Sequence, residues 1–170
     1  MDARWQVTSG ERDPATVRRL LGSLPDWFGI PAANAEYVAA ARELPTYLAR
    51  PTQHAATEHA DPVGVLLARR HFAEAAEIHL LAVEPSLHRK GVGRALVAAL
   101  ETDLLADGCR MLQVKTLSPS KPHAGYERTR QFYTTVGFWP LEEVDLWGPG
   151  NPCLILVKDL AHTSIENVSS

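Results

Sequence analysis

The chain has 170 residues, of which 45% are hydrophobic and 22% charged, and its formal net charge at pH 7 is -3. These values are typical of one globular domain and exclude a disordered or fibrous protein. They also argue against the broad basic surface that nucleic-acid binding usually requires. The longest apolar runs, such as Ala95–Leu100, are too short to cross a bilayer, so we expect no membrane partner.

The N-terminal residues resemble no secretory signal, and the only two cysteines, Cys109 and Cys153, lie far apart in the sequence. A disulfide framework is therefore not expected, and a reducing compartment is favoured. The seven histidines are scattered, and no Cys/His spacing predicts a zinc site. We expect a cytoplasmic protein without a bound metal.

Apolar periodicity and turn signals predict the elements of the first half of the chain. Asp13-Pro14 combines an N-cap residue with proline at the first helical position, which predicts a helix start. The polar run Gln53–Pro62 predicts a hairpin connection. The predicted elements are a strand at 5–7, a helix from 14 through 21, a helix at 31–44, a strand beginning at 47–48, and strands at 63–70 and 77–83.

The second half contains the clearest helix, which starts at Gly91 and repeats apolar residues every four positions until a predicted stop at Gly108. A strand at 111–117, a loop at 118–125, a helix at 126–136 and a last strand at 154–157 follow. The predicted order is β-α-α-β-β-β-α-β-α-β-β. It indicates one mixed α/β domain over residues 1–160 and a flexible tail over 161–170.

The segment Val83–Arg94 joins a predicted buried strand to a helix that begins at two glycines, Gly91 and Gly93. Glycine lets the backbone approach a ligand closely, and the first amides of a helix point outward without internal partners. The helix dipole adds positive potential at the same place, so the segment predicts a phosphate site. Three cationic side chains add full charges there: Arg89, Lys90 and Arg94.

Other readings of this segment are an ordinary basic helix start or a different phosphate loop. A dinucleotide fingerprint would need a third glycine where Leu96 stands, and the chain has no Walker-type loop. These absences argue against a nucleotide-dependent oxidoreductase or kinase.

The segment resembles the cofactor motif of the GNAT superfamily of N-acetyltransferases, which reads glutamine or arginine, two residues, glycine, one residue, and glycine or alanine. Gly91 and Gly93 take the two small positions, whereas His88 replaces the usual glutamine or arginine. The resemblance spans most of residues 63–160. It implies an α/β fold with a single mixed, mainly antiparallel sheet flanked by helices, and acetyl-CoA as the acyl donor. By this resemblance the cofactor would contact Leu81, Ala82, Val83, His88, Arg89, Lys90, Gly91, Val92, Gly93, Arg94 and Phe132.

Acetyl transfer to an amine needs a base, because an alkylammonium with a pKa of about 10.4 is mostly protonated at neutral pH. The run Ala76–Val83 resembles the catalytic strand of the histone-acetyltransferase branch, which implies that Glu77 is the base. Strand alternation puts His79 on the same face as an alternative base or a relay through water. Otherwise, Glu77 merely caps a strand edge and His79 is its polar neighbour.

The run Phe132–Phe138 resembles the family signature of tyrosine, three residues, glycine and phenylalanine. The resemblance implies that Tyr133 is the acid that protonates the leaving thiolate, and the alternative is a core aromatic residue. Tyr126 stands where the family often has asparagine. Since Cys109 has no neighbouring base in sequence, we expect direct attack in a ternary complex rather than an acyl-cysteine intermediate.

The acceptor is expected to be a primary amine of a small molecule or a protein lysine. In the family the connection between the first two helices often walls the acceptor cleft, which implies substrate binding by exposed Trp27 and Phe28. Alternatively, these two side chains plug the core. The loop Ser118–Gly125 is the other candidate lid. A non-catalytic acyl-CoA sensor or partner-binding module is the competing function, and a homodimer is allowed but not decided by the sequence.

Overall fold

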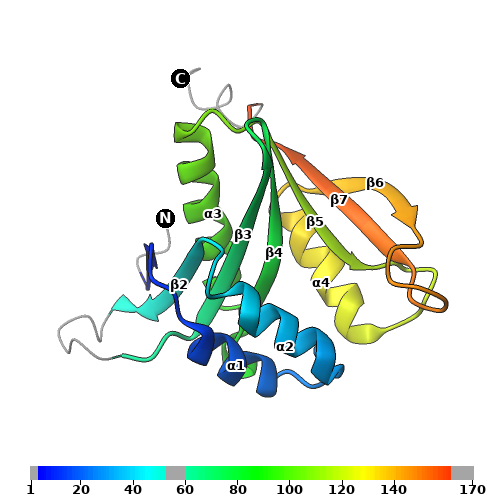
Figure 1. The fold of residues 1–170 in the computed structure, drawn as a ribbon, viewed down its shortest axis with the longest axis horizontal. Helices are drawn as coiled ribbons and strands as arrows, with labels where there is room; N and C mark the ends of the chain where they lie inside the picture. Colours follow the sequence, from blue (N-terminus) through cyan, green and yellow to red (C-terminus); the bar gives the residue numbers. More distant parts are fainter. Residues whose placement is uncertain (1–3, 53–59, 162–170) are drawn as a thin grey trace. The chain divides into compact units, whose positions relative to one another are not determined.

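The structure is a computed structural model and describes residues 4–52 and 60–161. The predicted order of strands and helices is confirmed (Figure 1). One short 3-10 helix, η2, is added before the third helix. The elements are β1 (Trp5–Ser9), α1 (Pro14–Gly22), α2 (Pro31–Ala40), β2 (Thr46–Pro51), β3 (Gly64–Phe72), β4 (Ala75–Val83), η2 (Pro85–Leu87), α3 (Val92–Ala106), β5 (Met111–Leu117), α4 (Ala124–Thr135), β6 (Trp139–Val144) and β7 (Cys153–Asp159).

The seven strands form a sheet in the order β1-β2-β3-β4-β5-β7-β6. β4 and β5 are parallel and pair Ala75–Ile78 with Met111–Val114. A parallel pair requires a crossover connection, which α3 provides between these strands. The pairs β1–β2, β2–β3, β5–β7 and β6–β7 are antiparallel. The expected α/β fold with a mixed, mainly antiparallel sheet is therefore confirmed.

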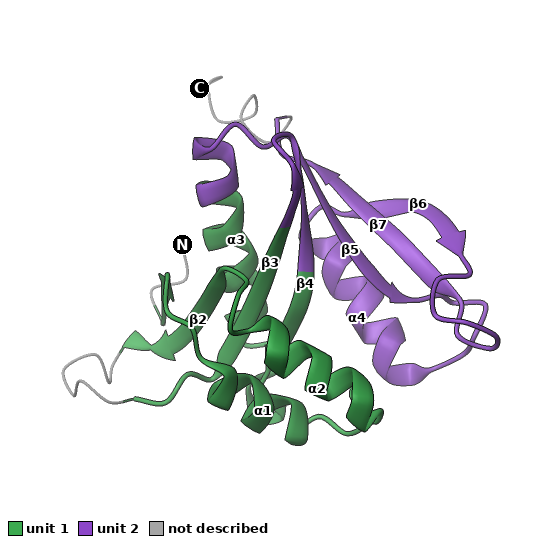
Figure 2. Ribbon diagram, in the orientation of Figure 1, with its two compact units in different colours: residues 1–69, 79–102 green, residues 70–78, 103–170 purple. Residues whose placement is uncertain are grey.

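The chain divides into two compact units, coloured separately in Figure 2. The first unit comprises residues 1–69 and 79–102, and the second comprises residues 70–78 and 103–170. β3 and β4 each contribute residues to both units. Residues 53–59 of the predicted hairpin connection and residues 162–170 of the predicted tail lie outside the described residues.

The core of the first unit is an apolar cluster formed by α1, α2 and residues of β2, β3 and β4. The predicted start of α1 is confirmed, because Asp13 Oδ1 accepts the Thr16 N–H at 2.8 Å and Pro14 takes the first turn. α2 ends at Ala40, earlier than predicted, and the chain continues in turns to Leu44. The cluster consists of Val17, Leu20, Leu21, Leu24, Val38, Ala41, Leu48, Val65, Leu67, Leu80 and Ala82.

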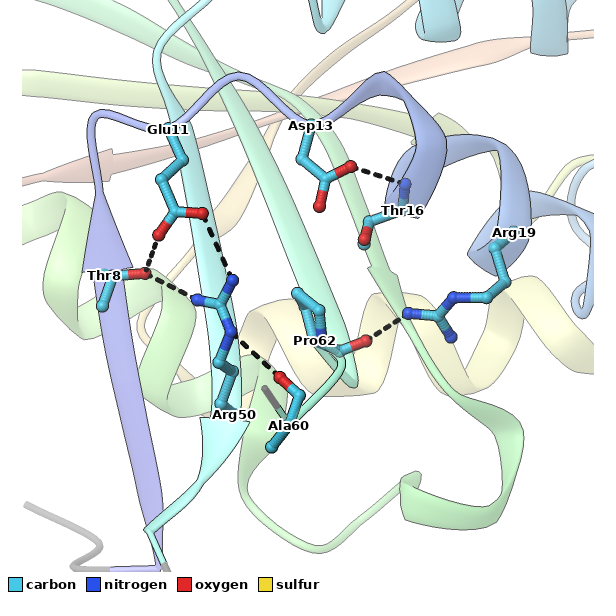
Figure 3. Close-up of polar contacts among 8 residues, drawn as sticks. All are labelled: Thr8, Glu11, Asp13, Thr16, Arg19, Arg50, Ala60 and Pro62. Atoms are coloured by element: carbon cyan, nitrogen blue, oxygen red, sulfur yellow. Dashed lines mark hydrogen bonds and ion pairs between the residues drawn. The ribbon is translucent and has the colours of Figure 1, made fainter. Parts of the chain in front are cut away.

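Two arginines hold the chain where it enters β3 (Figure 3). Arg50 of β2 donates to the Ala60 carbonyl at 3.1 Å and to Thr8 Oγ1 of β1 at 3.0 Å, and it pairs with Glu11 at 3.2 Å. Arg19 of α1 donates to the Pro62 carbonyl. A guanidinium presents several N–H groups in a fixed fork, so one side chain can bridge several segments. Residues 60–62 are thereby fastened to α1, β1 and β2.

The predicted stop of α3 at Gly108 is confirmed. Gly108 has a φ of +76°, which glycine adopts without strain, and the Cys109 N–H returns to the Leu104 carbonyl at 2.8 Å just after α3. α4 is fixed in the second unit by Arg130, which donates to the Leu117 carbonyl at 2.7 Å. Within residues 4–52 and 60–161, no helix combines the length and apolar character that a membrane span requires.

Gly64 lets the first turn of α3 approach β3. A Cβ at this position would lie 2.7 Å from Val92 Cγ1 and 3.0 Å from Leu96 Cδ1, and both side chains are buried. We expect Gly64→Ala to lower the free energy of unfolding by about 1–3 kcal/mol, because a packed core must shift to accept the methyl group. Urea denaturation followed by circular dichroism measures this change.

Gly22→Ala is the matched control for Gly64→Ala. A Cβ at position 22 meets nothing within 4 Å, so this change should be neutral or stabilise by up to about 1 kcal/mol. Equal effects of the two substitutions would contradict the packing role of Gly64.

Candidate functional site

The connection between β4 and α3 is a succession of tight turns. As β4 ends, the Glu84 N–H donates to the Val63 carbonyl at 2.9 Å. Within the connection, the N–H groups of Leu87, His88 and Lys90 each donate to the carbonyl three residues earlier. The loop therefore has a compact, internally bonded conformation, and the Lys90 amide is already used within it. We call residues 84–94 the anion loop.

Two residues of the anion loop have positive φ angles, Arg89 at +63° and Gly91 at +91°. Glycine adopts this region freely, but for a residue with a Cβ it costs roughly 1–2 kcal/mol. Such strain persists only where the surroundings enforce it, and it is concentrated at functional sites. Left-handed residues beside right-handed ones turn successive N–H groups toward one side, which creates a concavity for an anion.

The first amides of α3 add donors next to these two residues. The helix makes its first bond from the Ala95 N–H to the Gly91 carbonyl at 3.0 Å. The N–H groups of Val92, Gly93 and Arg94 precede that bond and so have no acceptor inside the helix, where the dipole is positive. These N–H groups at the start of α3 could bind a phosphate group. Three exposed cationic side chains belong to the same segment: Arg89, Lys90 and Arg94.

The anion loop is anchored by side chains of the first unit. Trp5 of β1 donates its indole N–H to the Lys90 carbonyl at 2.9 Å. His88 contacts the Val83 carbonyl at 2.8 Å, and since a carbonyl only accepts, its Nε2 is the donor. The Trp27 ring meets the His88 ring edge-to-face at a centroid distance of 5.6 Å. The unusual histidine of the motif thus ties the loop to the end of β4.

Trp27 and Phe28 are half-buried and pack against the core of the first unit, so they are less exposed than expected. The alternative expectation, that they plug the core, describes their packing. The Phe28 and Tyr37 rings lie edge-to-face at 6.0 Å, and the Tyr37 and His79 rings lie at 5.4 Å. The pair Trp27 and Phe28 therefore reaches two predicted site residues within the first unit. Trp27 contacts His88 directly, and Phe28 is linked to His79 by the ring of Tyr37.

Glu77 is buried in the second unit, with 6% of its surface exposed. Its carboxylate contacts Lys115 Nζ at 2.8 Å, His71 Nε2 at 2.6 Å and Gln113 Nε2 at 3.4 Å. Burial alone would raise its pKa, but the hydrogen bonds from Lys115, His71 and Gln113 and the charge of Lys115 together outweigh burial and hold the pKa of Glu77 below its ordinary value. An ionised, paired carboxylate is a weakened proton acceptor.

Tyr133 is buried in the second unit, with 4% of its surface exposed. Its ring lies edge-to-face with Phe132 at 5.2 Å and with Phe138 at 5.4 Å. The residues of the predicted signature are thus brought together as an aromatic group. In the loop Ser118–Gly125, which the sequence suggested as a candidate lid, His123 caps α4 by accepting the Tyr126 N–H at 3.3 Å.

Sequence reasoning missed the partners of the predicted site residues. Three of these partners belong to no sequence motif, namely Trp5, Tyr37 and His71. The folded chain places them against Lys90, His79 and Glu77, respectively. For Gln113 and Lys115 the sequence does contain a signal, because these two polar residues alternate with apolar residues in strand β5. Their match to Glu77 depends on the parallel register of β4 and β5, which the sequence does not reveal.

The two cysteines lie in the interior of the protein. Cys109 and Cys153 are both buried with free thiols, and burial raises the pKa of the Cys153 thiol. A buried thiol with a raised pKa is inert. Among the described residues, no group of three or more His, Cys, Asp or Glu side chains could hold a metal ion.

Comparison with solved structures identifies similar folds. A protein from Desulfovibrio desulfuricans described as belonging to the GNAT family of acetyltransferases is 20% identical, has a TM-score of 0.75, and matches 92% of this chain and 99% of its own. The ribosomal-protein-S18-alanine N-acetyltransferase from Escherichia coli is 16% identical, with a TM-score of 0.69 and coverage of 92% and 94%. An aminoglycoside 6'-N-acetyltransferase complexed with coenzyme A is 18% identical, with a TM-score of 0.65 and coverage of 91% and 97%.

Sequence comparison gives the family directly. No curated protein matches the chain significantly. The family model of the acetyltransferase (GNAT) family matches residues 22–138, a span that includes the anion loop and ends at Phe138 of the tyrosine signature. The chain therefore belongs to the GNAT family of acetyltransferases.

Proposed function

We propose that this protein is an N-acetyltransferase that transfers the acetyl group of acetyl-CoA to a primary amine by direct attack in a ternary complex. The family uses acetyl-CoA, and one of the proteins of similar fold is complexed with coenzyme A. The observation that carries the proposal is the start of α3, where strained backbone, amides without an acceptor inside the helix and cationic side chains come together.

The chain offers suitable groups for the diphosphate and the pantetheine arm of the coenzyme. The N–H groups of residues 91–94 would donate to the diphosphate, while the side chains of Arg89, Lys90 and Arg94 would balance its charge. By family resemblance, the backbone of Leu81–Val83 would pair with the pantetheine arm and Phe132 would contact the coenzyme. Acetyl-CoA supplies the activated thioester acyl group.

The acceptor amine must lose a proton before it can attack. We propose His79 as the proton acceptor, because an imidazole with a reference pKa of about 6.5 can take up a proton at neutral pH. Glu77 is the alternative, but its ion pair with Lys115 and its contact with His71 weaken it as a base. If Glu77 is the base, it would act through water. If His79 is the base, Glu77 would serve to hold His71.

We propose Tyr133 as the proton donor to the leaving thiolate. A thiol has a reference pKa of about 8.5, so a proton donor assists its departure. The proposal is supported by the match of Tyr133, Gly137 and Phe138 to the family signature.

The acceptor would be an amine of a small molecule or a protein lysine. The proteins of similar fold include one named for ribosomal-protein alanine and one named for aminoglycosides, that is, one protein acceptor and one small-molecule acceptor. The net charge of -3 mildly favours a cationic amine.

We propose a cytoplasmic location, and a homodimer is compatible with the fold. The competing function is a non-catalytic acyl-CoA sensor.

The central prediction concerns the acid and the base. His79→Asn should lower kcat about a hundredfold at neutral pH, and the loss should shrink toward pH 10, where the amine deprotonates unaided. Tyr133→Phe should lower kcat by a similar factor without weakening coenzyme A binding. Release of free thiol in the presence of a panel of amines measures activity, and calorimetry with coenzyme A measures binding.

Tyr126→Phe is the control for Tyr133→Phe, because it removes a hydroxyl from the same helix. A strong loss in Glu77→Gln with normal His79→Asn activity would move the base to Glu77. Coenzyme A binding without thiol release for any amine would favour the sensor, and failure to bind coenzyme A would refute the proposed function.

The lowered pKa of Glu77 predicts a pH-dependent stability. Since the folded pKa lies below that of the unfolded chain, about 4.3, the ion pair stabilises the fold above that pH, and the stabilisation is lost as the pH falls through the folded pKa. Glu77→Gln should lower the free energy of unfolding at pH 7 by about 1–3 kcal/mol, and the difference should narrow below about pH 4.

Urea denaturation between pH 3 and pH 7, in steps of about 1 pH unit, measures this difference. Glu36→Gln, at an exposed position of α2, should change stability by less than about 0.5 kcal/mol. If Glu77→Gln and the wild type lose stability in parallel down to pH 3, the ion pair is not the cause.

A further inference from the structure

We infer that Trp5 and Trp27 are positioning residues that hold the anion loop in its coenzyme-binding conformation. The inference rests on the proposed function and assigns Trp27 to the coenzyme rather than to the acceptor. The two side chains come from β1 and from the connection between α1 and α2, and they contact the loop on either side of Arg89.

Trp5 fixes the orientation of one peptide plane. Its indole N–H has only a donor role, and it donates to the Lys90 carbonyl at 2.9 Å. In a planar trans peptide the carbonyl and the following N–H point in opposite directions. Holding the Lys90 carbonyl toward Trp5 therefore directs the Gly91 N–H away from Trp5. This N–H is the first of the donors that the proposed function assigns to the diphosphate.

Trp27 acts through His88. The two rings are nearly perpendicular, at 84°, which is a favourable arrangement for aromatic pairs. The same imidazole donates to the Val83 carbonyl at 2.8 Å, so its ring must keep one orientation for that bond to persist. Trp27 supports this orientation from the core, against which it packs. His88 is thereby fastened to the last residue of β4.

The two anchors act on the neighbours of a strained residue. Arg89 has a φ of +63°, which persists only where the adjacent residues are held in place. On one side His88 is held by Val83 and Trp27, and on the other side Lys90 is held by Leu87 and Trp5. Removing either tryptophan should let the loop relax, so that coenzyme binding would have to restore its conformation.

Two substitutions test these anchors by calorimetry with coenzyme A. Trp5→Phe keeps an aromatic ring but removes the indole donor, and Trp27→Leu removes the edge-to-face contact. Each should raise the Kd for coenzyme A about three- to tenfold, the effect of losing one hydrogen bond or one aromatic pair. The KM of the amine acceptor should stay within about twofold for both variants, because neither contact is assigned to the acceptor.

Trp139→Phe and Trp147→Leu are matched controls at exposed positions of the second unit, with 48% and 42% of their surfaces exposed. Both should bind coenzyme A like the wild type. In a double-mutant cycle, Trp27→Leu and His88→Ala should be non-additive, since Trp27 acts through His88. Circular dichroism identifies folded variants, and if Trp27→Leu fails to fold, His88→Ala alone tests this anchor, because it removes the other ring of the pair.

The outcomes separate this inference from the proposed function. A wild-type protein that does not bind coenzyme A refutes the proposed function itself. If the wild type binds and the folded Trp5 and Trp27 variants bind equally well, the proposed function stands and the positioning role is overturned. If Trp27→Leu raises the KM of the amine and leaves the Kd for coenzyme A unchanged, Trp27 belongs to the acceptor site.

Discussion

Backbone N–H groups at the start of α3 can serve an anion only while the loop before them keeps its turns. The backbone at Arg89 resists those turns, because its φ of +63° is unfavourable for a residue with a Cβ. Glycine at position 89 would remove this resistance, yet it would also remove a positive charge beside the donors. The chain keeps the guanidinium and enforces the backbone through neighbouring contacts. The contacts of His88 and Lys90 therefore allow position 89 to combine a positive charge with an unfavourable backbone conformation.

Glu77 illustrates a different balance, between burial and pairing. A buried carboxylate loses hydration, and here Lys115 and His71 compensate for that loss and keep it ionised. The same contacts that stabilise the charge make the group a poorer proton acceptor. Position in a familiar motif thus does not fix a residue's chemistry, since the neighbours on β3 and β5 determine it. For this reason the proposed base is His79, with Glu77 kept as the alternative.

The sequence predicted what depends on local signals. The N-cap at Asp13, the stop at Gly108 and the glycine-led start of α3 each depend on residues within a few positions. The order of elements followed from apolar periodicity, and the sheet type followed from the family resemblance. Several contacts that define the site are long-range. Trp5 meets Lys90 from 85 residues away, and Glu77 meets Lys115 through a parallel register that no local pattern encodes.

The neighbouring residues Trp27 and Phe28 have different partners, and this difference bears on the acceptor. Trp27 contacts the anion loop through His88, whereas Phe28 reaches His79 through Tyr37. Under the proposed function, an amine delivered to His79 would approach the ring of Tyr37. An aromatic ring attracts an ammonium group and also packs against apolar surface, so this side favours a cationic amine with an apolar body. One short connection between α1 and α2 would then support coenzyme binding with one residue and acceptor choice with the next.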